Sequence, residues 1–353
     1  MYEYSHGGNA VFERGNADIV DLSANINPLG VPDGVESAII REFPNISRYP
    51  DNFNTLLRKK TAEFEGVNPE RLFFGNGASD IIFRLPRAIK AEKVMLCAPT
   101  FADYARSAMS YGAKICRHTL YKENDFALDS NFINAVQKES PNLVYICNPN
   151  NPTGKITKRE LIEELLNCCE KIGTSVVIDE CFMDFTNQAA LHTAKIFLEK
   201  YQNLVILKAF TKIFALPGIR LGYALCSDKI LIESLYFHGA DWAVSNLAQA
   251  AGLAALDGAE DFINRTVKFT TAQRKILENG LSQLGYKIFN SEANYVFLQN
   301  PYSFDLREKL DTQGIRIRSC GNYHGLNNSY YRIAVSTAEN NAKLLPATGR
   351  ATC

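Results

Sequence analysis

Lys212 follows a short, strongly apolar run, Leu204–Leu207, that predicts a buried strand. Gly218, Arg220 and Gly222 come soon after it in the chain. A lysine at the end of a buried strand, with an arginine nearby, suits an amine that loses its proton, attacks a carbonyl and lies beside a bound anion. Most lysines in loops are simply solvated, so a chemical role for Lys212 needs support from other parts of the chain.

Two other apolar runs also end in polar residues. The run Val176–Ile178 ends in Asp179, and the run that begins at Leu143 leads into the turn NPNNPTG, which contains Asn151. Runs of this kind are typical of parallel strands that are buried on both faces. Because ligands bind outside the carboxyl ends of such strands, we expect Asn151, Asp179 and Lys212 to converge on one site.

Several motifs together carry a resemblance to a known family. NPNNPTG, the aspartate after an apolar strand, and Thr211-Lys212 with a downstream PGIRLGY resemble the aspartate aminotransferase family of pyridoxal-phosphate (PLP) enzymes, fold type I. Within it, HGGN (6–9), SANINPLG (23–30), RYPD (48–51), GNGASD (75–80) and IRSCGNYHGL (317–326) resemble threonine-phosphate decarboxylase of cobalamin biosynthesis. The likeness runs from about residue 5 to residue 345. It implies an α/β fold with a mostly parallel sheet in a large domain and a smaller α/β C-terminal domain.

The resemblance implies roles for the residues that would hold PLP. Lys212 would bind the cofactor covalently, Asp179 would pair with the pyridine nitrogen, and Asn151 would donate a hydrogen bond to the phenolate oxygen. Phe101 would stack on the ring, although a core phenylalanine is the plain alternative. The residues expected at the cofactor phosphate are Gly77, Ala78, Ser79, Thr211 and Arg220, together with Tyr49 from a neighbouring subunit.

The phosphate contacts rest partly on local structure. Leu72–Phe74 predicts a strand that enters GNGASD, and a helix is expected from about Ser79 to Ile89. The first N–H groups of such a helix have no carbonyl partner and favour a phosphate. Tyr49 precedes a proline and therefore favours an extended backbone. Its predicted role makes the protein a homodimer with a shared active site, whereas a packed surface tyrosine is the alternative.

The substrate contacts implied by the resemblance involve two arginines on late strands. Arg332 would hold an α-carboxylate and Arg318 a phosphate, and a guanidinium is the natural partner of either group. Each could instead form a surface ion pair. The other residues expected at the substrate are His6, Asn9, Asn25 and Asn151. The alternatives are a turn for HGGN and an Asx-turn before Pro28 for Asn25.

Three positions depart from the pattern of relatives. Phe182 stands where aminotransferases usually carry a tyrosine, so one hydrogen bond to the cofactor phenolate is missing. Ala209 stands where a serine often holds the cofactor phosphate, which bears on cofactor affinity. Ser336 stands where a close relative would often have a basic residue.

The resemblance predicts decarboxylation of a small phosphorylated amino acid, L-threonine O-3-phosphate, to (R)-1-aminopropan-2-yl phosphate. L-Serine O-phosphate, which would give ethanolamine phosphate, is a competing substrate because one methyl group changes discrimination by only about 1–3 kcal/mol. Transamination of histidinol phosphate is the second enzymatic alternative. A third possibility is a PLP-fold binding protein without catalysis, although the lysine and the aspartate needed for catalysis are both present.

The composition is that of an ordinary globular enzyme. The 353 residues are 46% hydrophobic and carry 38 basic and 38 acidic side chains, so charge does not suggest a nucleic-acid or anionic-membrane surface. No apolar run reaches the roughly 18–20 residues of a membrane span, and the first residues do not resemble a signal peptide. Nine cysteines without a CxxC pair fit reduced thiols rather than zinc ligands. We expect a cytoplasmic protein without a metal site.

The chain divides by pattern into three parts. Residues 1–31 predict an extended arm that packs with the small domain, residues 32–240 the large PLP-binding domain, and residues 241–353 the small C-terminal domain. Helical periodicity predicts helices at 54–65, 229–237, 245–256 and 260–284. Strands are expected at 93–98, 286–289, 294–299, 315–318 and 330–335.

Overall fold

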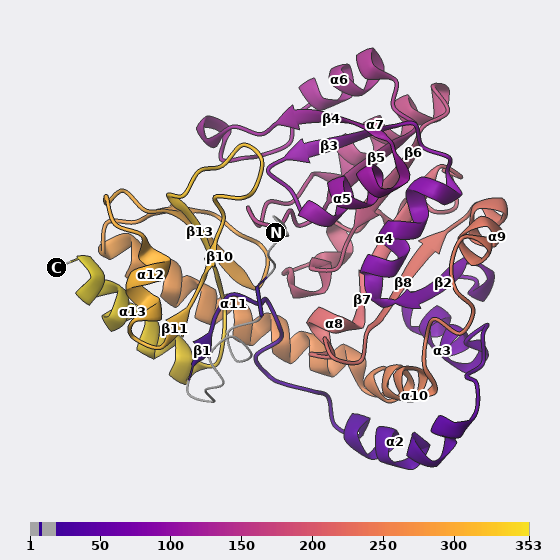
Figure 1. The fold of residues 1–353 in the computed structure, drawn as a ribbon, viewed down its shortest axis with the longest axis horizontal. Coiled ribbons are helices and arrows are strands. Elements are labelled where there is room, and N and C mark those ends of the chain that lie inside the picture. The colour runs from indigo at the N-terminus through magenta and orange to yellow at the C-terminus, as the bar shows by residue number, and fades with distance from the viewer. Residues whose placement is uncertain (1–6, 9–18, 353) are drawn as a thin grey trace.

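The computed structural model of the chain describes residues 7, 8 and 19–352. Two predicted substrate residues, His6 and Asn9, lie outside this part of the chain. The described chain forms a large lobe around one wide sheet and a smaller lobe around a second sheet (Figure 1). Among the described residues, no helix has the length and apolar character required to cross a membrane.

The large lobe contains a seven-stranded, mostly parallel sheet, which confirms the predicted α/β fold. Only β8 runs against its neighbours, and the other strands share one direction. In spatial order the strands are β2 (Leu72–Asn76), β8 (Leu221–Cys226), β7 (Leu204–Ala209), β6 (Ser175–Asp179), β5 (Leu143–Cys147), β3 (Lys93–Ala98) and β4 (Lys114–Thr119).

Each central strand is buried on both faces, which explains its continuous apolar sequence. On β6, Val176 and Ile178 belong to one hydrophobic cluster, whereas Val177 between them belongs to another on the opposite face. Side chains alternate along a strand, so one apolar run serves both clusters. The sheet is therefore fixed between two layers of helices, and its strand ends form a rigid edge for a site.

The helices of the large lobe cover both faces of this sheet (Figure 1). They are α2 (Val35–Glu42), α3 (Thr55–Glu65), α4 (Gly77–Ala88), α5 (Ala102–Tyr111), α6 (Asn131–Glu139), α7 (Arg159–Lys171), α8 (Phe210–Ile213), α9 (Lys229–Phe237) and α10 (Asn246–Ala255). Short 3-10 turns are η1 (Phe43–Ser47), η2 (Pro69–Arg71), η3 (Lys122–Asn124), η4 (Met183–Phe185), η5 (Ala189–Leu191) and η6 (Ala194–Phe197). Helix α4 begins two residues earlier than predicted, so Gly77, Ala78 and Ser79 form its first turn.

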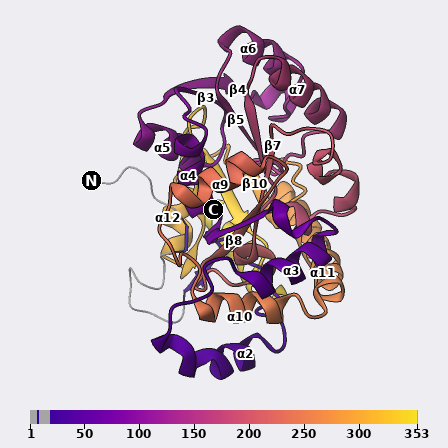
Figure 2. The same cartoon turned by 90° about the vertical axis from the view of Figure 1, so that its right-hand side faces the viewer.

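Helices α2, α3, α9 and α10 lie on the side of the large lobe that faces away from the small lobe (Figure 2). Exposed apolar side chains occur on and near these elements, including Phe43, Tyr49, Leu56 and Phe237. Tyr49 is 79% exposed and stacks on Trp242, with ring centroids 4.3 Å apart.

The small lobe contains a four-stranded antiparallel sheet, in the order β12 (Arg318–Ser319), β13 (Tyr330–Ala334), β10 (Tyr295–Gln299) and β9 (Lys287–Phe289). Its helices are the long α11 (Ala259–Gln283), α12 (Leu306–Asp311) and α13 (Ala338–Thr352). A separate pair of strands joins β1 (Val20–Asp21) to β11 (Ile315–Arg316) in parallel. Leu22, just after β1, is fully buried in the core of this lobe.

One predicted strand is wrong in detail. The pattern predicts a single strand over 315–318, but β11 pairs with β1 and β12 pairs with β13, with Ile317 between them. The chain leaves one sheet and joins the other at this point. As a result Arg316 bonds to Asp311 Oδ1 at 2.5 Å, while Arg318 lines a cavity between the lobes.

Candidate active site

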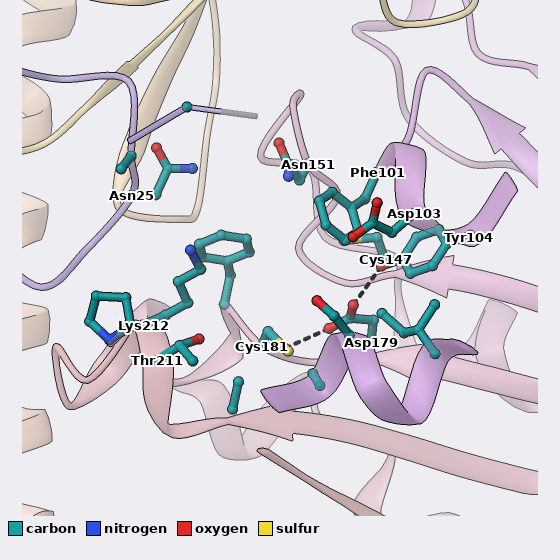
Figure 3. Close-up of a pocket in the computed structure, with 18 of the residues that line it drawn as sticks. Asn25, Phe101, Asp103, Tyr104, Cys147, Asn151, Asp179, Cys181, Thr211 and Lys212 are labelled. Carbon is teal, nitrogen blue, oxygen red and sulfur yellow. Dashed lines mark hydrogen bonds between the residues drawn. The ribbon is translucent and has the colours of Figure 1, made fainter. Parts of the chain in front are cut away.

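A cavity of about 220 Å³ lies at the carboxyl ends of β5, β6 and β7 (Figure 3), and Arg318 and Arg332 of the small lobe also line it. Most of the residues predicted for the site line it. They are Asn25, Ala78, Ser79, Phe101, Asn151, Asp179, Thr211, Lys212, Arg220, Arg318 and Arg332. The expected convergence of three strand ends is therefore present in the structure.

Lys212 lies on the single turn α8, which begins directly after β7. Its ammonium nitrogen lies 5.9 Å from the centroid of the Phe182 ring. Burial, followed by the nearby positive charges of Arg332 and Arg220, lowers the pKa of Lys212 to about 8. The amine is therefore much closer to its neutral, nucleophilic form at neutral pH than a solvated lysine.

Asp179 is the last residue of β6 and is held at both carboxylate oxygens (Figure 3). The backbone N–H of Cys181 donates to Oδ1 at 3.0 Å, and the Tyr104 hydroxyl donates to Oδ2 at 2.6 Å. Tyr104 is itself fixed by stacking on Tyr145, with centroids 4.8 Å apart. The carboxylate thus has a set orientation at the cavity wall.

The first turn of α4 lines the cavity through Ala78 and Ser79. Gly77 has a φ of +75°, and a side chain there would meet the Arg220 guanidinium at 2.7 Å. Gly222 on β8 passes so close that a Cβ atom would lie 2.3 Å from the Ala78 nitrogen. The helix N-terminus, Ser79, Thr211 and Arg220 together present N–H, O–H and guanidinium donors to an anion.

Arg318 and Arg332 are direct partners across the antiparallel strands β12 and β13. Residues that lie opposite each other in this way project from the same face of a sheet. Arg332 donates to Asn151 Oδ1 at 2.5 Å and to the Ser23 carbonyl at 2.7 Å. Arg318 donates to Asn322 Oδ1 at 2.8 Å. Both arginines line the same cavity as Lys212.

Asn25 lines the cavity and is only 1% exposed. Among the described residues, neither of its side-chain polar atoms has a hydrogen-bond partner. A buried amide without partners costs free energy unless a bound group satisfies it. This observation favours a polar ligand beside Asn25.

Some predicted residues are not brought into the cavity wall. Gly77 lies behind it, against Arg220. Tyr49 lies on the outer face with Trp242, so its predicted contact with a neighbouring subunit stays a prediction. His6 and Asn9 lie outside the described residues, although Gly7 between them lines the cavity.

The structure also adds residues that the sequence reasoning missed, including Ser23, Asp103, Tyr104, Cys147, Cys181 and Tyr323. Tyr104 lies inside helix α5, where an aromatic residue normally indicates core packing. A weak signal for Tyr323 existed, because it belongs to the motif IRSCGNYHGL.

The donors around the cavity fit the chemistry of PLP. The cofactor needs a reactive amine, a carboxylate for its ring nitrogen and N–H donors for its phosphate. Lys212, Asp179 and the first turn of α4 could supply these three groups within one cavity.

Comparison with known proteins gives the family. Residues 17–347 match the model of the family "Aminotransferase class I and II". The chain is 32% identical to a threonine-phosphate decarboxylase of Salmonella typhimurium, over 98% of this chain and 96% of that protein. It is 31% identical to a histidinol-phosphate aminotransferase of Methanococcus aeolicus, over 93% of this chain and 88% of that one.

Comparison with solved structures shows similarity to the same family. The solved structure of the histidinol-phosphate aminotransferase from Clostridium acetobutylicum matches with a TM-score of 0.88 and 28% identity, covering 95% of this chain and 99% of that one. These matches span nearly the whole chain. It therefore belongs to the class I and II aminotransferase family, whose members are fold type I enzymes that use PLP as their cofactor.

Proposed function

We propose that the protein decarboxylates L-threonine O-3-phosphate to (R)-1-aminopropan-2-yl phosphate, a step of cobalamin biosynthesis. The observation that carries the proposal is the pair Arg318 and Arg332, which line the cavity of Lys212 from opposite positions on two strands. Two guanidinium groups suit a substrate with two separate anionic groups. The similarity to a threonine-phosphate decarboxylase along 98% of the chain supports the same substrate.

The donors that line the cavity support the proposed cofactor contacts. When PLP is bound, Lys212 would hold it through its amine, Asp179 would pair with the ring nitrogen, and Asn151 would donate a hydrogen bond to the phenolate oxygen. The α4 N-terminus, Thr211 and Arg220 would hold the phosphate, and Tyr104 keeps the Asp179 carboxylate oriented through its 2.6 Å hydrogen bond. When bound, PLP supplies a conjugated ring that accepts the electron pair of a bond broken at the substrate Cα.

The substrate is then held at both ends. Arg332 binds the α-carboxylate, exchanging its present bond to Asn151 for a charged partner. Arg318 binds the phosphate, and Asn25 donates to a polar group between the two. Charge-assisted hydrogen bonds of this kind fix orientation as well as position.

Lys212 moves the proton that completes the reaction. Lys212 lines the cavity that would hold the substrate, so its free amine would be the group that transfers a proton at the substrate Cα. A pKa near 8 lets the same nitrogen give up and regain a proton around neutral pH.

The orientation of the carboxylate decides between decarboxylation and transamination. A bond breaks readily when it stands perpendicular to the cofactor ring, because only then does its electron pair enter the π system. Arg332 on β13 would orient the carboxylate and so favour cleavage of the Cα–carboxylate bond. Phe182 stands where the related aminotransferases usually carry a tyrosine, and it has no hydroxyl that could bond to the cofactor phenolate.

A histidinol-phosphate aminotransferase is the second candidate, favoured by 31% identity to such an enzyme over 93% of the chain. The test is to incubate PLP-loaded protein separately with threonine phosphate, serine phosphate and histidinol phosphate and to identify the products by mass spectrometry. We expect aminopropanol phosphate and CO₂ from threonine phosphate, with no need for a keto acid. Turnover of histidinol phosphate that depends on a keto acid, without release of CO₂ from threonine phosphate, would refute the proposal.

We further propose a cytoplasmic homodimer in which Tyr49 reaches the PLP phosphate of the other subunit. The exposed stack of Tyr49 on Trp242 supports a surface that another subunit covers. Mixing inactive Lys212→Ala dimers with Tyr49→Phe dimers tests the shared site. In a mixed dimer, one site would combine an intact Lys212 with an intact Tyr49 from the other subunit, so we expect wild-type activity at that site. An activity equal to the sum of the two unmixed proteins would contradict the shared site.

A further inference from the structure

The four-stranded sheet of the small lobe has two unlike faces. The apolar residues of one face that lie in the core of this lobe are Val296, Leu298, Tyr331 and Ile333. On the other face Phe297 lies directly opposite Arg332, and Arg332 lies opposite Arg318. Residues that are paired in this way project from the same side of a sheet. The two proposed substrate arginines therefore share one face with Phe297.

Three aromatic rings, which we call the aromatic patch, lie on the same face as these arginines. Phe289 is the strand partner of Phe297, and Tyr330 lies two residues before Arg332 on β13. The ring centroids of Phe297 and Tyr330 lie 5.6 Å apart, and those of Phe289 and Phe297 lie 5.3 Å apart. All three rings belong to a hydrophobic cluster that also contains core residues of the large lobe. This face of the sheet is therefore packed against the large lobe.

Phe126 provides the large-lobe side of this contact. It lies just after the short turn η3 and is only 3% exposed. Its ring centroid lies 5.0–5.9 Å from those of Phe289, Phe297 and Tyr330, and each pair meets edge to face. Edge-to-face packing is a favoured geometry for aromatic rings. Phe126 thus ties the large lobe to β10 and to β13, the strand that carries Arg332.

The backbone that presents Phe126 is strained. Asp125 and Phe126 have φ angles of +59° and +56°, which residues with a large side chain rarely adopt. The Asp125 carboxylate pairs with the Lys155 ammonium, and the Lys155 carbonyl accepts a hydrogen bond from the Asn150 N–H at 2.8 Å. The loop that carries Phe126 is therefore held by the turn that contains Asn151. Strained residues persist where their surroundings fix them, and they cluster at functional sites.

We propose that Phe126 is a positioning residue that sets the small-lobe sheet so that Arg332 and Arg318 reach the cavity of Lys212. This inference rests on the proposed function, because it takes the two arginines as the partners of the substrate anions. Phe126 lies outside the lining of the cavity and acts through the arginines. Asp179 and the first turn of α4 belong to the large lobe. Loss of the Phe126 ring should therefore weaken substrate binding and leave PLP binding unchanged.

The experiment compares Phe126→Ala with a second perturbation and a control. Lys155→Met removes the partner of Asp125 and so loosens the strained loop. The control is Phe197→Ala, because Phe197 is 6% exposed and packs edge to face with Tyr201 inside the large lobe. For each variant we would measure the PLP affinity of the apoenzyme, KM and kcat with threonine phosphate, and the denaturation midpoint. Stopped-flow absorbance of the PLP-loaded enzyme gives the dissociation constant of threonine phosphate before turnover.

Phe126→Ala should raise KM and the dissociation constant of threonine phosphate by about tenfold or more, with PLP affinity within about twofold of the wild-type value. Lys155→Met should change them in the same direction by about threefold. Phe197→Ala should lower the denaturation midpoint as Phe126→Ala does, but keep the dissociation constant of threonine phosphate within about twofold.

Three results would overturn the role of Phe126. These are an unchanged affinity for threonine phosphate in Phe126→Ala, an equal loss of PLP affinity in that variant, and an equal loss of affinity for threonine phosphate in Phe197→Ala. If Phe126→Ala does not fold, Phe126→Leu takes its place, and unchanged affinity in both Phe126→Leu and Lys155→Met would also overturn it.

Failure of the proposed function and failure of the role of Phe126 give different results. If wild-type enzyme does not act on threonine phosphate, the proposed function is wrong. The same comparison of variants with histidinol phosphate, followed by cofactor absorbance, then tests Phe126. If wild-type enzyme acts on threonine phosphate and Phe126→Ala binds it as tightly, only the role of Phe126 is wrong.

Discussion

Two lysines four residues apart, Lys208 and Lys212, have opposite electrostatic surroundings. Lys208 lies within β7 and is 7% exposed, and its ammonium lies 2.8 Å from Asp184 Oδ1 and 3.2 Å from Glu65 Oε1. Burial alone would lower the pKa of Lys208, but Asp184 and Glu65 outweigh it and hold the pKa above its usual value. Lys212 is half-buried, and loss of solvation together with the positive charges of Arg332 and Arg220 lowers its pKa to about 8.

The charged side chains around Lys208 form a cluster in which positive and negative charges balance. Glu65 also pairs with Lys195 at 2.9 Å and accepts a hydrogen bond from the Tyr223 hydroxyl. Burial would raise the pKa of Glu65, but Lys208 and Lys195 lower it to about 2. Strand β7 thus carries Lys208, whose charge stabilises the fold. It leads directly to Lys212, whose charge is disfavoured. The difference shows that local compensation, and not burial itself, separates a structural ammonium from a reactive amine.

The largest effect on activity is expected from replacement of Lys212. Lys212→Ala should lower kcat by about 10⁴-fold or more, because it would remove both the covalent anchor and the proton carrier that we propose. The free energy of unfolding of the apoenzyme should change by less than about 1 kcal/mol, since Lys212 forms no ion pair with a carboxylate in the part of the chain that the structure describes. Steady-state assays and denaturant titration measure the two quantities. A large loss of stability would remove the contrast with Lys208.

Replacement of Lys208, whose charge is balanced by carboxylates, should mainly lower stability. Lys208→Met takes the shared cation away from Glu65 and Asp184, so the free energy of unfolding should fall by about 3–5 kcal/mol. The control is Lys229→Met, which breaks the exposed pair with Glu70 and should leave the stability nearly unchanged. Equal losses from the two variants in denaturant titration would show that the buried cluster is not structural.

The lowered pKa of Lys212 predicts how PLP uptake depends on pH. The neutral amine reacts with the aldehyde, so the rate of PLP uptake by the apoenzyme should rise about tenfold per pH unit below pH 8 and level off above it. Stopped-flow absorbance from about pH 6 to pH 10 measures the midpoint. Arg332→Met removes one of the positive charges that lower this pKa, so its midpoint should move to higher pH. A wild-type midpoint as high as that of a solvated lysine would contradict the assignment.

The smallest effect is expected at the residue that orients Asp179. Tyr104→Phe removes the hydroxyl that donates to Asp179 Oδ2 but keeps the ring stacked on Tyr145, so PLP should bind about three- to tenfold more weakly. The matched control is Tyr145→Phe, because the Tyr145 hydroxyl donates to the Ile82 carbonyl instead. PLP titration of the apoenzymes measures both affinities. Equal weakening would indicate general packing rather than orientation of Asp179.

The sequence predicted those parts of the fold that depend on local pattern. The strand Lys93–Ala98 and the helix Lys229–Phe237 were predicted to the residue, because continuous or periodic apolar residues set their limits. The meeting of Asn151, Asp179 and Lys212 was predictable as well, because parallel strands share one carboxyl edge.

What the sequence did not predict depends on contacts between distant segments. The alignment of Arg318 with Arg332 follows from strand register, and the bond from Tyr104 to Asp179 joins a helix to a strand 75 residues away. Lys208 did carry a local signal, as a charged residue within an apolar strand, but its two carboxylate partners come from separate elements. Such pairings arise from packing and have no periodic pattern in the chain.

Gly222 constrains how this enzyme could change over evolution or in the laboratory. Any larger residue there would push against the backbone that forms the first turn of α4, since even a methyl group would lie 2.3 Å from the Ala78 nitrogen. Mutagenesis that aims to make the site bind a different cofactor would have to keep Gly222. Variation in substrate range can instead accumulate on the small-lobe wall of the cavity, which side chains such as Tyr323 line.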